Sequence, residues 1–124
     1  MGTARPVVLD AGALIAFERG DQRVRALLLQ AKRIVVPAGV LAQVWREGKR
    51  QVPLRALCNS ARTEVPALDR ATAEAAGILC GRARTRDVVD ASVVLAGRRE
   101  HALVVTSDPD DLRRIDPTLN IAAI

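Results

Sequence analysis

The stretch Pro6–Gly20 (PVVLDAGALIAFERG) places an apolar run directly before an aspartate and a helix-forming run. Pro6–Leu9 is short, apolar and rich in valine, which predicts a buried strand that ends at Asp10. Ala11–Arg19 follows as a predicted helix, and Gly20 ends it. The unit is therefore a strand, an acidic residue at its carboxyl end, and a helix.

The same alternation of strand and helix recurs along the chain. Further strands are predicted at residues 34–36, 63–65 and 103–106, with an edge strand at 120–123, and helices over 21–33, 38–48, 53–60, 69–81, 87–100 and 109–114. Strands that are apolar throughout and alternate with helices indicate a parallel sheet covered on both faces. We expect a single domain over residues 1–124, because the chain has room for only one.

The composition is apolar and basic. Hydrophobic residues make up 49% of the chain, the only aromatic residues are Phe17 and Trp45, and the formal net charge is +5. A surface of this sign attracts polyanions such as nucleic acid or an anionic membrane. With so few aromatic side chains, phosphate contacts rather than base stacking would supply the affinity for a nucleic acid.

The cysteines and the N-terminal region argue against several protein classes. Cys58 and Cys80 lie far apart without zinc-site spacing, so we expect both to be reduced core residues. Asp10 and Glu18 interrupt any signal-peptide-like apolar run, and no apolar stretch is long enough to span a bilayer. The sequence predicts a cytoplasmic protein with no membrane association.

Acidic residues follow two of the predicted strands. Asp10 follows the first and Asp108 follows the strand at 103–106, so both should emerge at one edge of the sheet. Asp87 and Asp90 are spaced i, i+3 at the start of a helix and share one face. Each acid also has a structural interpretation, since aspartate at a helix start is a common N-cap. Taken singly, the four acids leave both interpretations open.

Taken together, the acids favour a metal site. Clustered carboxylates repel one another unless a cation neutralises them, and hard oxygen ligands suit Mg²⁺ or Mn²⁺. Such a site supports phosphodiester hydrolysis with a metal-activated water. His101, the single histidine, is expected to be a solvated residue and offers no competing catalytic constellation. Two other acid-based classes fit poorly, because Leu9 precedes Asp10 where a receiver domain has an acid, and Gly12 stands where an Asp-x-Asp phosphatase has its second aspartate.

Four segments in order resemble the motifs of PIN-domain ribonucleases, in particular the VapC toxins of VapBC toxin–antitoxin modules. They are residues 7–16 (VVLDAGALIA), 36–42 (VPAGVLA), 87–96 (DVVDASVVLA) and 104–112 (VVTSDPDDL), and they extend over nearly the whole chain. The resemblance implies an α/β fold, a PIN-like three-layer α/β/α sandwich with a central, mostly parallel sheet of four or five strands. It also implies that Asp10, Asp90 and Asp108 are the catalytic, metal-binding residues for Mg²⁺, with Mn²⁺ as an alternative.

Position by position, the resemblance assigns supporting roles and shows one departure. Asp87 would be a supporting acid, and Thr106 or Ser107 would position Asp108 or a metal-bound water. The family usually has glutamate in its second segment, where this chain has Gln43. Glu47 would lie one helical turn later and substitute for that glutamate, or it would pair with a neighbouring cation instead. Gln43 itself would hold a metal-bound water through its amide.

The resemblance implies an endoribonuclease toxin that cuts a structured RNA, such as transfer or ribosomal RNA. Its partners would be a cognate VapB-type antitoxin and a second copy of the chain in a homodimer. Basic residues that flank the second and third segments would bind RNA phosphates: Arg46, Lys49, Arg50, Arg82, Arg84 and Arg86. The alternative, motivated by Gln43, is a PIN-fold protein that binds RNA or an antitoxin with weak or no catalysis.

Overall fold

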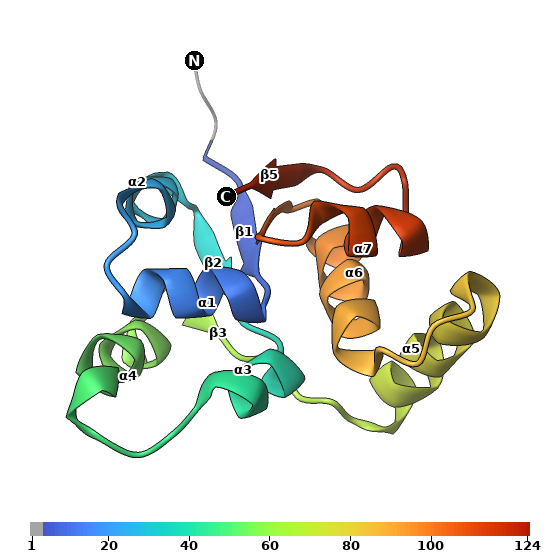
Figure 1. The fold of residues 1–124 in the computed structure, drawn as a ribbon, viewed down its shortest axis with the longest axis horizontal. Coiled ribbons are helices and arrows are strands. Elements are labelled where there is room, and N and C mark those ends of the chain that lie inside the picture. The colour runs from blue at the N-terminus through green and yellow to red at the C-terminus, as the bar shows by residue number, and fades with distance from the viewer. Residues whose placement is uncertain (1–3) are drawn as a thin grey trace.

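A computed structural model describes residues 4–124 (Figure 1). The strands are β1 (Pro6–Leu9), β2 (Arg33–Val35), β3 (Thr63–Glu64), β4 (Leu103–Thr106) and β5 (Ile121–Ala123). The helices are α1 (Ala11–Glu18), α2 (Gln22–Gln30), α3 (Ala38–Val44), α4 (Val52–Asn59), α5 (Arg70–Ala83), α6 (Val88–Glu100) and α7 (Pro109–Ile115), with a 3-10 turn, η1 (Lys49–Gln51). The predicted alternation of strands and helices is confirmed.

The strands form one parallel sheet in the order β3-β2-β1-β4-β5. At its centre, Val8 of β1 lies opposite Val35 of β2 on one side and Val104 of β4 on the other. All three valines are almost completely buried. The central strands are therefore covered on both faces, as their uninterrupted apolar sequences predict.

Helices flank this sheet in a three-layer arrangement. Figure 1 shows α1, α2 and α4 to one side of the strands and α5, α6 and α7 to the other. The helix α1 contacts α2, α3 and α4, whereas α6 contacts α5 and α7. The α/β/α class predicted from the sequence is confirmed, and the sheet is wholly rather than mostly parallel.

Two helices end earlier than the sequence predicts. The helix α2 ends at Gln30, where the guanidinium of Arg62 donates to the carbonyls of Leu28 and Ala31 at 3.2 and 2.7 Å in place of a further helical turn. The helix α3 ends at Val44 rather than near residue 48. There the side chain of Gln51 replaces helical hydrogen bonds, since it accepts from the amide of Arg46 at 2.6 Å and donates to the carbonyl of Val44 at 2.9 Å.

The junction between α5 and α6 also differs from the prediction. The sequence predicts a helix over residues 69–81, but α5 continues to Ala83 and ends on Arg84, which has a left-handed backbone conformation (φ 57°). Arg82 and Ala83 both have high helix propensity, which is consistent with the extra half turn. Asp87 then caps α6, so only a short connection separates the two helices.

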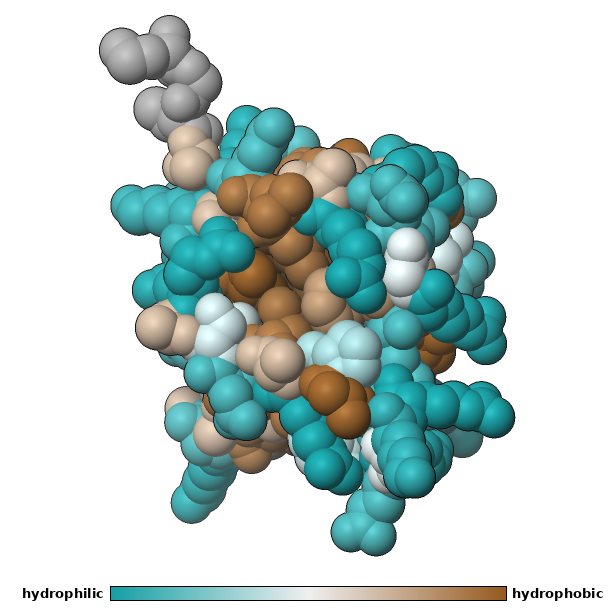
Figure 2. Space-filling model, turned by 90° about the vertical axis from the view of Figure 1, so that its left-hand side faces the viewer, coloured by the Kyte–Doolittle hydropathy of each residue, from teal (hydrophilic) through white to brown (hydrophobic). Residues whose placement is uncertain are grey.

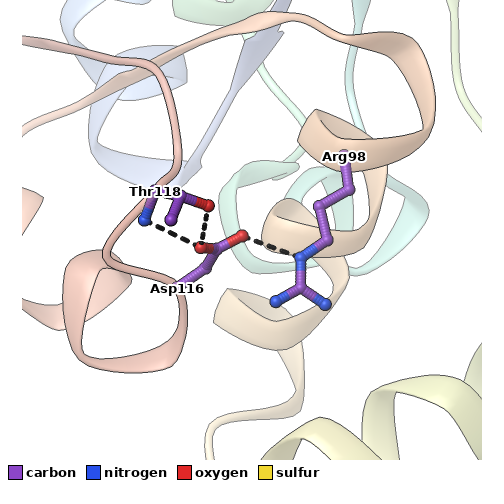
Figure 3. A network of polar contacts seen from close by, with 3 residues as sticks. All are labelled: Arg98, Asp116 and Thr118. Atoms are coloured by element: carbon purple, nitrogen blue, oxygen red, sulfur yellow. Dashed lines mark hydrogen bonds and ion pairs between the residues drawn. The ribbon is translucent and has the colours of Figure 1, made fainter.

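A buried polar network fixes the C-terminal turn that leads into β5. Asp116 is 5% exposed, and its carboxylate accepts hydrogen bonds from Arg98 Nε at 2.7 Å and from the amide and hydroxyl of Thr118 at 2.9 and 2.6 Å (Figure 3). Burial alone would raise the pKa of Asp116, but the hydrogen bonds from Thr118 and Arg98 outweigh it and lower this pKa. The carboxylate is therefore fully satisfied by its structural partners.

Both cysteines are free, Cys80 buried and Cys58 half-buried, in line with their expected role in the core. Among residues 4–124, no helix has the length and apolar character needed to cross a membrane.

Candidate active site

The candidate site lies where the order of the strands reverses. The chain leaves β1 to build β2 and β3 on one side, and later returns to add β4 and β5 on the other. In parallel α/β sheets, ligands bind outside the carboxyl ends of the strands at this switch point. Leu9 at the end of β1 is paired with Val105 of β4, and the amide of Asp10 donates to the carbonyl of Val105 at 3.3 Å. The residues that follow the two strands are thus brought side by side, as the sequence predicts.

Asp10 is the buried member of the site, with 6% of its surface exposed. One carboxylate oxygen accepts from the amide of Ala13 at 2.8 Å, and the other accepts from the hydroxyl of Thr106. Burial raises the pKa of Asp10, the hydrogen bonds from Thr106 and Ala13 lower it, and the negative charge of Asp108 raises it; the net shift is upward. Unlike Asp116, this buried carboxylate has an acid rather than a cation as its charged neighbour.

Thr106 connects Asp10, which follows β1, with Asp108, which follows β4. The hydroxyl of this buried residue donates to Asp10 and accepts from the amide of Asp108 at 2.8 Å. A single side chain therefore fixes the carboxylate that follows β1 and the backbone that follows β4. The proposed positioning role of Thr106 has a geometric basis, whereas Ser107 is exposed and makes no such bridge.

Asp90 has the most perturbed pKa of the site, raised from 3.8 to about 7. The largest cause is burial, followed by the charge and hydrogen bonding of Asp87, and then by the charges of Asp111 and Asp10. Every charged group in that series is an aspartate. Within residues 4–124, none of Asp10, Asp87, Asp90, Asp108 and Asp111 forms a salt bridge. The site therefore carries negative charge that no side-chain cation neutralises.

The structure shows which of the acids cap a helix and which do not. Asp10 caps α1 through the amide of Ala13, and Asp87 caps α6 through the amide of Asp90 at 2.9 Å. Asp108 occupies the N-cap position of α7, but its side chain makes no capping hydrogen bond. Capping accounts for Asp10 and Asp87 in part, and it leaves the Asp108 carboxylate without a structural task.

Two contributors to the site were not predicted. Asp111 acts on Asp90 electrostatically, and its i, i+3 spacing from Asp108 was the signal that both lie on one face of α7. Gly12 is the second: a Cβ on this residue would collide with Ser107 Oγ and would lie 3.6 Å from an Asp10 carboxylate oxygen. The absence of a side chain at Gly12 lets the segment after β4 approach α1 closely.

The donor chemistry at the site fits a hard divalent cation, although no closed cage is formed. Among the described residues, no group of three or more His, Cys, Asp or Glu side chains is arranged to hold a metal ion by itself. Mg²⁺ is usually held by one or two carboxylates together with waters and a substrate phosphate, so a cage built only from the protein is not required. A cation would also offset the burial and the neighbouring negative charges that raise the pKa values of Asp10 and Asp90.

Gln43 and Glu47 are the positions considered in place of the family's glutamate. Gln43 and Glu47 are exposed and line a hollow together with Arg46 and Lys49. The expectation that Glu47 continues the helix one turn beyond Gln43 is wrong, because α3 ends at Val44 and Trp45 is extended. The i, i+4 argument for Glu47 as a ligand therefore no longer holds.

The candidate RNA-binding residues form two groups. Arg46, Lys49 and Arg50 lie in the connection between α3 and α4 and are exposed. Arg82, Arg84 and Arg86 lie at the end of α5 and in the connection to α6, and they are exposed as well. Figure 1 shows these two connections on opposite sides of the molecule.

The topology and the site can be compared with solved structures. VapBC2 from Rickettsia felis, bound to a DNA fragment from its promoter, matches with a TM-score of 0.70 and 18% identity, covering 96% of this chain and 98% of the other. FitAcB from Neisseria gonorrhoeae matches with a TM-score of 0.63 and 16% identity, covering 93% and 95% of the two chains. FitAB bound to an IR36 DNA fragment gives 0.64 and 16%, covering 94% of each chain. This chain has the PIN fold.

Sequence comparison adds nothing to this result, since no protein-family model and no curated protein sequence matches the chain significantly. At 16–18% identity, the structural likeness establishes the fold alone, and the chemistry of the site has to be argued from its own residues.

Proposed function

We propose that the chain is a Mg²⁺-dependent endoribonuclease, the toxin of a cytoplasmic toxin–antitoxin module, which hydrolyses phosphodiester bonds in a structured RNA such as transfer or ribosomal RNA. The observation that carries the proposal is the pair of perturbed acids at the strand switch point. Asp10 is buried beside Asp108, and the pKa of Asp90 is raised to about 7 by burial and by neighbouring aspartates. Perturbed acids in such a position are typical of functional sites.

Asp10, Asp90 and Asp108 would bind Mg²⁺ or Mn²⁺, and Asp87 would support them. When bound, the ion would supply Lewis acidity toward the scissile phosphate and the attacking water. The chain's own residues set the geometry: Thr106 and the amide of Ala13 fix the two oxygens of Asp10, and Thr106 also holds the amide of Asp108. Asp90 would give up its proton on cation binding, because the cation would offset the burial and the neighbouring negative charges that raise its pKa.

RNA is a reasonable substrate because the protein is basic around an acidic centre. The net charge of +5 favours a polyanion, and no arginine or lysine forms a salt bridge with the site's aspartates within residues 4–124, so the excess positive charge lies around the site rather than in it. A phosphodiester that bridges the cation and the surrounding arginines would be held by both.

An antitoxin and a second toxin subunit are proposed as protein partners. The structures of VapBC2 and of the FitA–FitB complexes, which share this fold, contain toxin and antitoxin together. Figure 2 shows a hollow with a hydrophobic floor and a hydrophilic rim, on the face of the molecule that carries α2 and α4 in Figure 1. Leu29 of α2 and Val52 of α4 are 80% and 59% exposed. Apolar side chains left exposed on the two helices favour a protein partner at this face.

The test is cleavage of transfer RNA by the purified, antitoxin-free chain. We expect fragments in the presence of Mg²⁺ or Mn²⁺ and none in EDTA, and no fragments with Asp10→Asn under either condition. Equal cleavage by the wild type and Asp10→Asn would overturn the proposal, because it would identify a contaminating nuclease or a different site.

The alternative is a PIN-fold protein that binds RNA or an antitoxin with weak or no catalysis. The observation that favours it is the composition of α3, whose residues Ala38–Val44 contain no carboxylate, so Gln43 offers only an amide. Metal-dependent binding of RNA without any fragments, in the experiment above, would select this alternative.

A further inference from the structure

A trough runs along α1, from the residues beside Asp10 to the segment that joins α3 and α4. It consists of two hollows, of about 590 and 910 Å³. The first extends from Gly12 and Ser107 to Arg19. The second extends from Arg19 to the segment that joins α3 and α4. The two hollows share Ile15 and Arg19, so they form one continuous surface, which we call the α1 trough.

One end of the α1 trough adjoins the acids. Ser107 immediately precedes Asp108, and a Cβ placed on Gly12 would lie 3.6 Å from an oxygen of Asp10. A polymer chain cut at the site would therefore have to leave it either along this trough or over the opposite side, where α6 and α7 lie. The trough is an open path that begins at the reacting position.

The other end of the α1 trough is positively charged. Its second hollow is lined by four cationic residues, Arg19, Arg46, Lys49 and Arg50, against two carboxylates, Glu18 and Glu47. Within residues 4–124, none of these four cations forms a salt bridge. One acid is already engaged, because Glu18 accepts a hydrogen bond from Gln51 at 3.2 Å. In the first hollow, Asp21 is likewise occupied in capping α2.

The segment that carries three of these cations is held in place by a buried side chain. Gln51 is 5% exposed, and it bonds to the amide of Arg46, the carbonyl of Val44 and the carboxylate of Glu18. Three hydrogen bonds to a buried amide fix the course of residues 45–50 beside α1. The cations therefore project from an anchored segment rather than from a free loop.

An arginine covers one face of each of the two aromatic rings. The guanidinium of Arg25 lies 4.9 Å from the ring centroid of Phe17, and that of Arg55 lies 5.7 Å from the ring of Trp45. Neither ring lines either hollow, so a nucleic acid in the trough would be held through its phosphates and not through stacked bases.

We propose that the α1 trough binds the ribose-phosphate backbone of single-stranded RNA on one side of the scissile bond. The proposal rests on the proposed nuclease function, and it adds the route of the substrate across the surface. Affinity in the trough is dominated by phosphate contacts from Arg19, Arg46, Lys49 and Arg50, and it is insensitive to base identity.

The test measures binding without cleavage. A short, fluorescein-labelled, single-stranded oligoribonucleotide of mixed sequence is titrated with the chain in EDTA over a series of salt concentrations. For Lys49→Ala/Arg50→Ala we expect severalfold weaker binding and a fall of about 1.4 in the slope of log K against log salt, since each phosphate contact on a single strand contributes about 0.7. Arg5→Ala/Lys32→Ala is the matched control, because it removes one arginine and one lysine from exposed positions outside the trough, just before β1 and just before β2.

Two further variants complete the design. Gln51→Leu keeps the net charge but removes the anchor, and we expect it to weaken RNA binding more than the control does. If it does not fold, Lys49→Ala/Arg50→Ala, which changes only exposed side chains, decides the question. Poly-L-glutamate is the competitor that represents an acidic protein partner, and it should displace the RNA only weakly.

The outcomes of this test are independent of those for cleavage. If the Lys49/Arg50 variant and the control lose RNA affinity and salt dependence (the slope of log K against log salt) to the same extent, the proposal that the trough binds RNA is overturned, even if the protein cleaves RNA. Binding of poly-L-glutamate with the affinity and variant dependence of RNA would also overturn it, in favour of an acidic peptide. A selective loss in the trough variant would support it, even if no condition yields cleavage.

Discussion

Asp10 and Asp116 are two aspartates buried to the same degree, at 6% and 5% exposure, yet their pKa values shift in opposite directions. Asp116 faces Arg98 and receives two hydrogen bonds from Thr118, so its negative charge is compensated. Asp10 faces Asp108, and its hydrogen bonds from Thr106 and Ala13 do not offset burial. Asp116 is a structural carboxylate. Asp10, by contrast, has no neighbouring cation among the described residues and lies at the edge of the sheet where parallel α/β proteins bind ligands.

The largest expected effect comes from Asp10→Asn. Cleavage should fall by at least about a hundredfold, since loss of even an outer partner of a metal ligand commonly costs 10–100-fold. The melting temperature should stay the same or rise, because asparagine caps a helix as well as aspartate does and the variant removes an uncompensated buried charge. Rate measurements and thermal denaturation in EDTA check the two parts. A large fall in melting temperature would instead support a purely structural role for Asp10.

Removal of the Thr106 bridge should have the next largest effect. Thr106→Val keeps the shape but loses both hydrogen bonds, so we expect cleavage to fall about 10–100-fold. Thr106→Ser restores the hydroxyl and should recover most of the activity. The Mg²⁺ affinity of each variant, measured by calorimetry, separates positioning from general loss of structure. Equal activity of the valine and serine variants would remove Thr106 from the site.

Asp116→Asn should show the opposite pattern to Asp10→Asn. The variant loses a charge-assisted hydrogen bond to the half-exposed Arg98, so the free energy of unfolding at pH 7 should fall by about 1–2 kcal/mol. Because the pKa of Asp116 is lowered in the folded state, this stabilisation is present above the ordinary pKa and disappears on acidification. Activity per folded molecule should be unchanged. Urea denaturation at neutral and acidic pH measures the effect, and unaltered stability would contradict it.

The smallest effect is expected for Glu47→Gln. Glu47 is exposed and lies beyond the end of α3, so the free energy of unfolding should change by no more than about 0.5 kcal/mol. Cleavage should remain close to that of the wild type. Activity lost to the same extent as in Asp10→Asn would show that Glu47 is a metal ligand after all, and it would place the site closer to α3.

Local patterns in the sequence were sufficient for the fold. The valine-rich strands, the capping aspartates at positions 21 and 69, and the alternation of elements predict a parallel sheet, and this prediction is confirmed. The end of α3 was not predictable in the same way, because it depends on the side chain of Gln51, which lies seven residues beyond the helix. Local propensity contains no information about such a contact.

The site was predictable only in part, for a related reason. The positions of Asp10 and Asp108 follow from strand order, which the alternation of elements implies. The involvement of Asp111 and the close approach at Gly12 depend on how α7 and α1 pack, and only the structure shows them. The roles of Asp10, Asp90 and Asp108 as metal ligands remain predictions.

The titration of Asp90 tests the central claim, that the site holds uncompensated negative charge intended for a cation. Its pKa is raised from 3.8 to about 7, so the folded state binds more protons than the unfolded state within this window. The contribution of Asp90 to stability should therefore decline as the pH rises from about 4 to about 7 in metal-free buffer. Cation binding should reverse the decline.

The most direct measurement is an NMR titration of the aspartate side-chain carboxyl carbons in EDTA and in excess Mg²⁺. We expect Asp90 to titrate at about 7 in EDTA and at a clearly lower pH with Mg²⁺, while Asp116 titrates below its ordinary range in both buffers. A pKa for Asp90 close to 3.8 in EDTA, with no change on adding Mg²⁺, would contradict the account.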